Sequence, residues 1–214
     1  MTEVDRIAGV LADRFAITAV NRKYGWGVPS LNVLDCVLSL NRRYDGFVVP
    51  RVRAFSERHP NVLTLRRLGQ LIRHYRSPLE FSVAELQYRD TARATTLLGV
   101  IDYLLSVQRL HAGPTETAPL ARWARSVQPS DCRTVGVRGF GLAGFQYLRM
   151  LFGVQTAKPD VHIRRFVSGL IGRPVTDLDA LVLLELAARH AKVPLREADY
   201  EIWRQLSNRG AGVG

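Results

Sequence analysis

Residues 133–173 read RTVGVRGFGLAGFQYLRMLFGVQTAKPDVHIRRFVSGLIGR and hold the most informative pattern in this 214-residue chain. Gly139 and Gly141 flank a phenylalanine, and the apolar spacing that follows predicts an amphipathic helix over residues 142–152. Glycines at this spacing allow a tight turn between two helices, and they leave the backbone N–H groups of the second helix open to an anion. Arg138 adds positive charge beside the turn, which suits a contact with phosphate, and an ordinary helix–helix connection is the alternative.

A second helix start follows nineteen positions after Gly141, in the sequence PDVHIRRFV at residues 159–167. An aspartate before an apolar-periodic run, such as Asp160 here, is a common helix N-cap. A fixed carboxylate can also stabilise developing positive charge and deprotonate a water molecule. The two roles are compatible, and the residue types alone leave both open.

The rest of the chain shows helical periodicity. Apolar stripes at residues 4–15 and 33–38 repeat every three to four positions, and no alternating apolar–polar run predicts a sheet. Capping-box spacing at Ser82 with Glu85 and at Thr176 with Asp179 indicates two helix starts. We therefore predict an all-α protein, with further helices at residues 47–58, 63–75, 82–88, 91–110, 116–127, 161–171, 177–190 and 195–207.

Composition excludes several classes of protein. Apolar residues make up 47% and charged residues 23% of the chain, which is typical of a globular protein and excludes wholesale disorder. The longest apolar runs are too short to cross a bilayer, and the acidic N-terminus lacks the apolar segment of a signal peptide. Cys36 and Cys132 are too few for a four-thiolate cluster and are expected to stay unpaired in a reducing compartment. These features predict a cytoplasmic protein with no membrane partner.

The charge balance points to a polyanionic partner. Lys and Arg total 30 against 19 Asp and Glu, which gives a net charge of +11, and only three of the cations are lysine. Guanidinium groups match phosphate oxygens with forked donors, so the excess favours nucleic acid. A GC-rich genome also favours arginine over lysine, but it does not explain the net excess.

The glycine turn, the apolar helix and the run Asp160-Val161-His162 together resemble the helix-hairpin-helix DNA glycosylase superfamily, which includes endonuclease III and the 8-oxoguanine glycosylases. The resemblance is specific over about 40 residues and looser over residues 29–130. It implies two helical lobes with a DNA-binding cleft, a helix-hairpin-helix motif on the DNA backbone and Asp160 as the catalytic carboxylate. The implied DNA contacts are Asn41, Gly139, Phe140, Gly141, Ala143, Gly144 and His162. Arg42, next to Asn41, is either a further phosphate contact or a solvated residue, and Arg138 stands where the family usually has proline.

The same resemblance suggests the organisation of the chain. Residues 1–214 are expected to form one glycosylase-like domain, with lobes at about 30–130 and at 1–29 plus 131–210, and a tail at 211–214. Residues 29–41 look like the first core helix of the family, after which Asn41 would wedge into the gap left by a flipped base. Double-stranded DNA is the expected partner of a monomeric, nucleoid-associated protein.

The sequence departs from the family in ways that bear on the reaction. Members that also nick DNA carry a lysine early in the second hairpin helix, where Ala143 stands here, so we predict glycosylase activity without lyase activity. Lys158 remains an alternative amine. No cysteine follows Cys132, so the iron–sulfur cluster of many relatives is absent and no cofactor is required. By the resemblance, a structural K⁺ or Na⁺ would bind the carbonyls of Val135, Val137 and Phe140.

The base pocket is less well defined. Tyr24, Trp26 and Tyr44 flank the first core helix, either to stack on an extruded base or as core aromatics. Asp35 lies on a polar stripe with Asn32 and Ser39; it would hydrogen-bond a base if the stripe faces a cleft, and we favour a stripe that faces water.

The leading hypothesis is therefore a monofunctional DNA glycosylase that releases a damaged or modified base, in repair or in defence against modified phage DNA. A non-catalytic helix-hairpin-helix DNA-binding protein is the alternative. A helical protein that binds RNA or an acidic partner is a third hypothesis, which leaves the motif unexplained. The excised base, and any general acid, are not indicated by the sequence.

Overall fold

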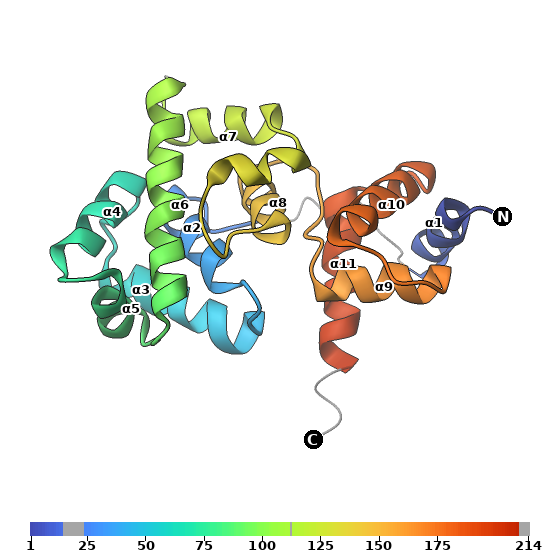
Figure 1. The fold of residues 1–214 in the computed structure, drawn as a ribbon, viewed down its shortest axis with the longest axis horizontal. Helices are drawn as coiled ribbons and strands as arrows, with labels where there is room; N and C mark the ends of the chain where they lie inside the picture. The colour runs from blue at the N-terminus through green and yellow to red at the C-terminus, as the bar shows by residue number, and fades with distance from the viewer. Residues whose placement is uncertain (15–23, 112, 210–214) are drawn as a thin grey trace. The chain divides into compact units, whose positions relative to one another are not determined.

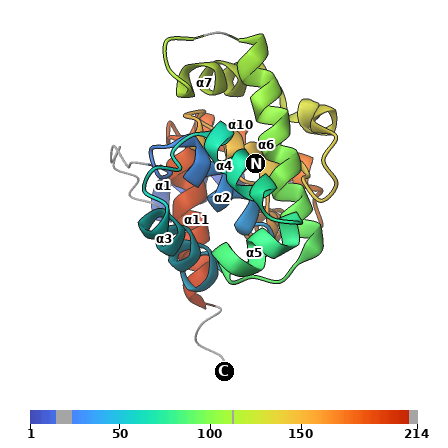
Figure 2. The same ribbon diagram turned by 90° about the vertical axis from the view of Figure 1, so that its left-hand side faces the viewer.

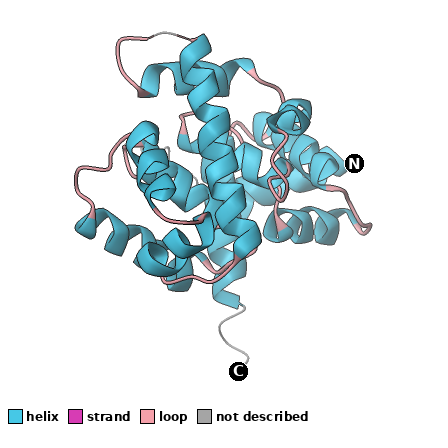
Figure 3. Cartoon of the chain, turned by 60° about the vertical axis from the view of Figure 1, so that its left-hand side comes forward, coloured by secondary structure: helices cyan, strands magenta, loops and turns pink. Residues whose placement is uncertain are grey.

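The structure is a computed structural model that describes residues 1–14, 24–111 and 113–209. Every regular element in these residues is helical, which confirms the predicted all-α class (Figure 3). The chain divides into two compact units, a central unit of residues 24–154 and a terminal unit of residues 1–23 with 155–214. The sequence placed the division near residue 130, but it lies after Val154, so the glycine turn belongs to the central unit.

The central unit is built around one long helix, α6 (Thr91–Leu110). Figures 1 and 2 show α6 in green, and α2, α4, α5 and α7 all pack against it. The remaining elements of the unit are α2 (Pro29–Leu38), the π-helical turn η1 (Tyr44–Val48), α3 (Val49–Arg58), α4 (Leu65–His74), α5 (Pro78–Leu86), α7 (Thr117–Ser126), the 3₁₀ helix η2 (Pro129–Val135) and α8 (Leu142–Leu151).

Helix α2 is the interior helix of this unit, because every one of its residues is buried. Its apolar stripe packs into a core with residues of α3, α4, α6 and α8. The polar stripe of Asn32, Asp35 and Ser39 is buried as well, so the expectation that it faces water was wrong. Buried polar groups need hydrogen-bond partners, and the partners come from elements distant in sequence that the pattern within α2 does not indicate.

The terminal unit has its own core, formed by α1 (Glu3–Arg14), α9 (Val161–Ile171), α10 (Asp177–His190) and α11 (Leu195–Arg209). Ile7 and Leu11 of α1 are fully buried in it. The predicted capping box of Thr176 and Asp179 is confirmed at the start of α10. Residues 15–23 and the expected tail at 211–214 lie outside the described residues.

Two predicted helix starts differ from the structure. Ser77 caps α5 and Pro78 opens it, so the expected cap Ser82 lies inside the helix, where its hydroxyl donates to Tyr88 O at 2.7 Å. The pattern of Ser82 and Glu85 matched a capping box, but Pro at the first helical position was the stronger signal. Residues 44–48 form a π-helical turn ahead of α3. Among the described residues, no helix is both long and apolar enough to traverse a bilayer.

Candidate nucleic-acid interface

The glycine turn between η2 and α8 has the backbone geometry that its glycines allow. Gly136 and Gly139 have φ angles of 66° and 81°, in the left-handed region that favours glycine, and Phe140 N donates to Val137 O at 3.1 Å. Gly141 is the N-cap of α8, and within the described part of the chain no side chain caps this helix start. Because Gly141 is exposed, the first N–H groups of α8 are open to an anion.

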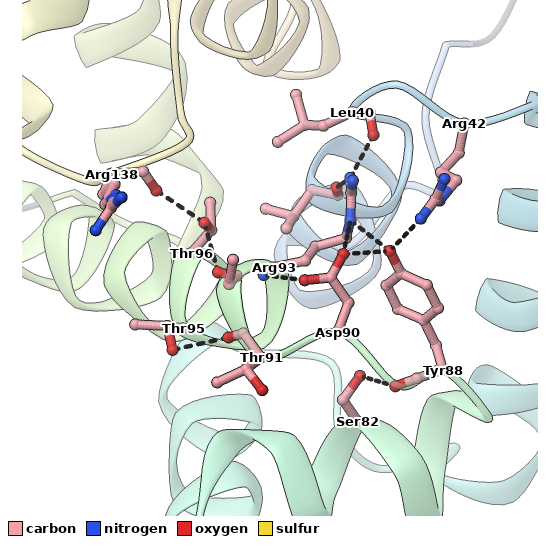
Figure 4. Close-up of polar contacts among 12 residues, drawn as sticks. Leu40, Arg42, Ser82, Tyr88, Asp90, Thr91, Arg93, Thr95, Thr96 and Arg138 are labelled. Carbon is pink, nitrogen blue, oxygen red and sulfur yellow. Dashed lines mark hydrogen bonds and ion pairs between the residues drawn. The ribbon is translucent and has the colours of Figure 1, made fainter.

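The turn rests on α6. Thr96 Oγ1 lies 2.8 Å from Arg138 O and also within hydrogen-bond distance of Ala92 O inside its own helix (Figure 4). A Cβ at Gly99 would lie 3.0 Å from Val137, so the absence of a side chain there lets the turn approach α6 closely. Arg138 itself is exposed. The backbone of the turn is therefore held by α6, while the Arg138 side chain is exposed to solvent.

Two of the residues expected to contact DNA lie in the interior instead. Phe140 is 4% exposed, and Gly144 is buried against the Phe140 ring and the Leu40 side chain, where a Cβ would come within 2.9–3.0 Å of both. These two residues support the turn from inside rather than present a side chain to a ligand. Ala143, at the position of the family's lysine, is partly buried in the first turn of α8.

The loop after α2 lies beside this turn, because Leu40 contacts the site of Gly144. Arg93 of α6 donates through Nη1 to the carbonyls of Val37, at 3.0 Å, and of Leu40, so it holds the end of α2 against α6 (Figure 4). Asn41 is exposed with φ 54°, a left-handed conformation that asparagine tolerates better than most residues. The structure thus brings the end of α2, next to Asn41 in the sequence, and the glycine turn to the same helix, α6.

Two of the four residues suggested for a base pocket, Trp26 and Tyr44, converge on the carboxylate of a third, Asp35. Asp35 is fully buried and accepts hydrogen bonds from Trp26 Nε1 at 2.7 Å, from Tyr44 Oη at 2.6 Å and from Tyr147 Oη at 2.7 Å. Burial and the Asp35 charge raise the pKa of both Tyr44 and Tyr147 far above the ordinary range, so both phenols stay protonated as donors. The fourth residue, Tyr24, lies two positions before Trp26 and is partly buried.

Tyr147 is a residue that the sequence did not single out. It lies 112 positions from Asp35, on α8, and no local pattern connects the two. Asn32 makes a similar long-range link: its Oδ1 accepts Trp26 N at 2.8 Å, and its Nδ2 donates to Leu151 O at 3.3 Å. The polar groups of this cluster are thus engaged with one another across α2, α8 and the segment before α2.

In the terminal unit, Asp160 is the N-cap of α9. Its Oδ1 accepts His162 N at 2.8 Å and Ile163 N at 3.5 Å, while its Oδ2 lies 4.0 Å from Lys158 Nζ. The Asp160 side chain is 25% exposed. Capping therefore occupies one carboxylate oxygen and leaves the other beside the Lys158 ammonium group. His162 is partly buried in the first turn of the same helix.

A second carboxyl group supports the segment before Asp160. Asp199 of α11 accepts Lys158 N at 2.8 Å, and Lys158 O accepts Asp160 N at 2.7 Å. Burial, with the Asp160 charge as the second cause, raises the pKa of Asp199 to about 8. The sequence contained no signal for this residue, because its partner is 41 positions away, in the loop before α9.

The remaining sequence predictions concern thiols and ions. Cys36 and Cys132 form no disulfide within the described residues, as predicted, and Cys36 Sγ lies 3.3 Å from Gly144 O. Of the three carbonyls suggested for a monovalent cation, that of Val137 accepts Phe140 N, which leaves it one lone pair for an ion. Among the described side chains, no group of His, Cys, Asp and Glu is arranged to bind a metal.

Comparison with known proteins gives one match. A family described as a domain of unknown function, DUF8548, matches residues 6–207, which includes the glycine turn, Asp160 and the Asp35 cluster. No curated protein and no solved structure matches the chain. The family has no assigned function, so the resemblance to helix-hairpin-helix glycosylases stays a prediction from the residues. With nearly its whole length matched, this chain belongs to the DUF8548 family.

Proposed function

We propose that this protein is a monofunctional DNA glycosylase, which hydrolyses the N-glycosidic bond of a flipped-out damaged or modified base and leaves an abasic site. In this proposal η2, the glycine turn and α8 form a helix-hairpin-helix motif on the phosphate backbone of double-stranded DNA, and Asp160 is the catalytic carboxylate. The protein acts without a required cofactor, as a monomer in the cytoplasm. A K⁺ or Na⁺ at the carbonyls of Val135, Val137 and Phe140 remains an expectation from the resemblance.

The observation that carries the proposal is that the two carboxylate oxygens of Asp160 have different contacts. Oδ1 caps α9, which fixes the side chain, and Oδ2 lies 4.0 Å from Lys158 Nζ, while the side chain as a whole is 25% exposed. A fixed carboxylate of this kind can stabilise the oxocarbenium charge that builds at C1′ of the deoxyribose, and it can orient or deprotonate the attacking water. The target nucleotide must first leave the base stack.

Charge supports a DNA partner. Residues 24–154 contain 17 arginines, no lysine and nine acidic residues, so the unit that carries the glycine turn also holds +8 of the net charge of +11. Exposed Arg42 and Arg138 both lie on this unit, and Arg138 precedes the start of α8 by four residues. A contact through backbone amides and arginines binds phosphates without regard to sequence, as an enzyme that scans DNA for one base requires.

Absence of lyase activity rests on Ala143, which cannot form a Schiff base. Lys158 is the amine closest in sequence to Asp160, and it lies within ion-pair range of that carboxylate. Lyase activity that is lost in Lys158→Met would assign the reaction to this amine and would contradict the monofunctional proposal.

The alternative is a DNA-binding protein that releases no base, and the Asp35 cluster favours it. Trp26 and Tyr44 already donate to Asp35, together with Tyr147, so the groups suggested for the base pocket are occupied by one another. A glycosylase would have to recognise its base through other groups, or open this cluster. Activity measurements separate the two functions.

The test is base release from duplex oligonucleotides and phage DNAs that carry alkylated, oxidised, deaminated and enlarged bases, with and without alkali. We expect strand breaks only after alkali, and we expect Asp160→Asn to slow base release about 100- to 10,000-fold. Asparagine caps helices as well as aspartate does, so this variant should stay folded. Asp13→Asn, the same change at an exposed residue of α1, is the control. Duplex binding without release from any substrate would favour the alternative.

A further inference from the structure

The hydroxyl group of Tyr88 connects the loop after α2 to the start of α6. It donates to Asp90 Oδ2 at 2.8 Å, and it accepts Arg42 Nη2 at 3.1 Å and Arg93 Nε at 2.9 Å (Figure 4). A phenol has one hydrogen to donate and two lone pairs to accept with, so all three positions of this hydroxyl are used. Tyr88 therefore binds two arginines and one carboxylate at a single atom.

Asp90 and Arg93 fix the position of that hydroxyl. Asp90 is the N-cap of α6, and its Oδ1 accepts Arg93 N at 3.0 Å. Arg93 is 13% exposed, and its Nη1 donates to the carbonyls at the end of α2. The backbone N–H of Arg93, the Tyr88 hydroxyl and the Arg93 side chain lower the pKa of Asp90, so Asp90 stays ionised and keeps its charge next to the two arginines.

Arg42 is the exposed member of this network. Its guanidinium carbon lies 5.6 Å from the centre of the Tyr88 ring and 5.7 Å from that of Phe47, within the range of a cation–π contact. The two rings meet edge to face, with centroids 4.8 Å apart. The guanidinium is thus held over two rings and by one hydrogen bond, which leaves other N–H donors for a ligand.

We propose that Tyr88 is a positioning residue for nucleic-acid binding, whose hydroxyl holds the Arg42 guanidinium in place for a phosphate of duplex DNA. The inference rests on the proposed DNA-binding function and adds to it a residue that never touches the ligand. An arginine held in advance loses less conformational freedom when it binds phosphate, because its rotamer is already selected. Tyr88 contributes no charge to the complex. Its loss should therefore lower the affinity for DNA without changing the salt dependence, whereas loss of Arg42 should change both.

The test uses an unmodified 20-base-pair duplex as the probe, with the full chain and fluorescence anisotropy at 50–200 mM KCl. Tyr88→Phe keeps the ring but removes the hydroxyl, and we expect about 3- to 10-fold weaker binding with a nearly unchanged salt slope. Arg42→Ala should weaken binding and also lower the slope of log K against log salt by about 0.9, the value for one lost phosphate contact. The double variant should bind no more weakly than Arg42→Ala alone.

Tyr103→Phe is the matched control. Tyr103 lies on α6 and its hydroxyl accepts Trp123 Nε1 at 3.0 Å, so this variant loses a tyrosine hydroxyl contact that does not involve Arg42. If Tyr88→Phe binds the duplex no more weakly than Tyr103→Phe, the positioning role is wrong while DNA binding stands. If the wild-type protein does not bind the duplex, the proposed function fails and the inference fails with it.

A second variant tests the role without a change at Tyr88. Arg42→Lys keeps the positive charge but lacks the planar guanidinium that the rings and the hydroxyl hold. We expect a wild-type salt slope with affinity reduced about 3- to 10-fold, and wild-type affinity in this variant would overturn the positioning role. Circular dichroism melts of each variant verify that the fold is intact.

Discussion

At the scale of single residues, Asp199 gives the protein a distinctive pH dependence. An ordinary aspartate has a pKa of about 4, whereas burial and the Asp160 charge raise the pKa of Asp199 to about 8. Between these values the folded protein keeps a proton on Asp199 that the unfolded chain releases. The free energy of unfolding therefore falls as the pH rises from about 4 to about 8 through this group.

The variant Asp199→Asn should remove that contribution. Its amide oxygen can still accept Lys158 N, as Asp199 Oδ1 does at 2.8 Å, so the support of the segment before Asp160 is retained. Urea unfolding at pH 5, 6, 7 and 8 should show that the wild-type protein loses more stability over this range than the variant does. Asp13→Asn, at an exposed position, should follow the wild-type curve. Parallel curves for wild type and Asp199→Asn would contradict the raised pKa.

Residue roles could be predicted only where the partners are close in sequence. Asp160 was identified as a possible N-cap from the run that follows it, and the structure confirms the cap. Asp35 was recognised as part of a polar stripe, but its burial was not, because Tyr147 lies on another helix 112 positions away. Arg93 holds the loop after α2, and Thr96 holds the glycine turn. Neither residue belongs to a sequence motif, so only the contacts in the structure identify these roles.

At the scale of elements, the start of α8 offers a comparison of two glycines. Gly144 is packed against Phe140 and Leu40, and Gly141 has open space among the described residues and a φ of −92°. Gly144→Ala should destabilise the protein by about 1–3 kcal/mol through overpacking, although alanine gains helix propensity. Gly141→Ala should change stability by less than about 1 kcal/mol yet weaken duplex binding, because its Cβ stands where a phosphate would approach the amides.

Chemical denaturation and duplex anisotropy of the two variants check this prediction together. Equal destabilisation by both would show that the turn tolerates no side chain at all. Wild-type duplex affinity in Gly141→Ala would indicate that the N-terminus of α8 is not the phosphate contact, whatever else binds DNA.

Element boundaries were predictable where a local stop signal is present. The predicted bounds of α9 and α10 agree with the structure, since Asp160 and Thr176 cap them and Gly172 ends α9 in the left-handed region. The start of α5 was missed because the pattern at Ser82 resembled a cap, and η1 was missed because a single π-helical turn has no periodicity of its own. In both segments the local sequence pattern was compatible with more than one helix start.

At the scale of the whole molecule, the two units differ in charge. The central unit carries a net charge of +8 and the terminal unit +3, while Asp160 belongs to the terminal unit. Electrostatic attraction to phosphate should therefore come mostly from residues 24–154, and the proposed catalysis by Asp160 should require the remainder. Binding and catalysis are then separable by cutting the chain at the division.

Residues 24–154 form one continuous segment with a core of their own, so we expect this fragment to fold alone. It should show a helical circular dichroism spectrum and one cooperative thermal transition, because its buried apolar residues contact one another within the segment. It should bind the unmodified duplex with a salt slope close to that of the full chain, since the proposed phosphate contacts at Arg42, Arg138 and the start of α8 lie within it. It should release no base from any substrate, because Asp160 is absent.

Full-length Asp160→Asn is the reference, because this point substitution should abolish base release while the variant still binds the duplex. A fragment that folds but has lost most of the salt-dependent affinity would place the DNA contacts in the terminal unit, contrary to the charge distribution.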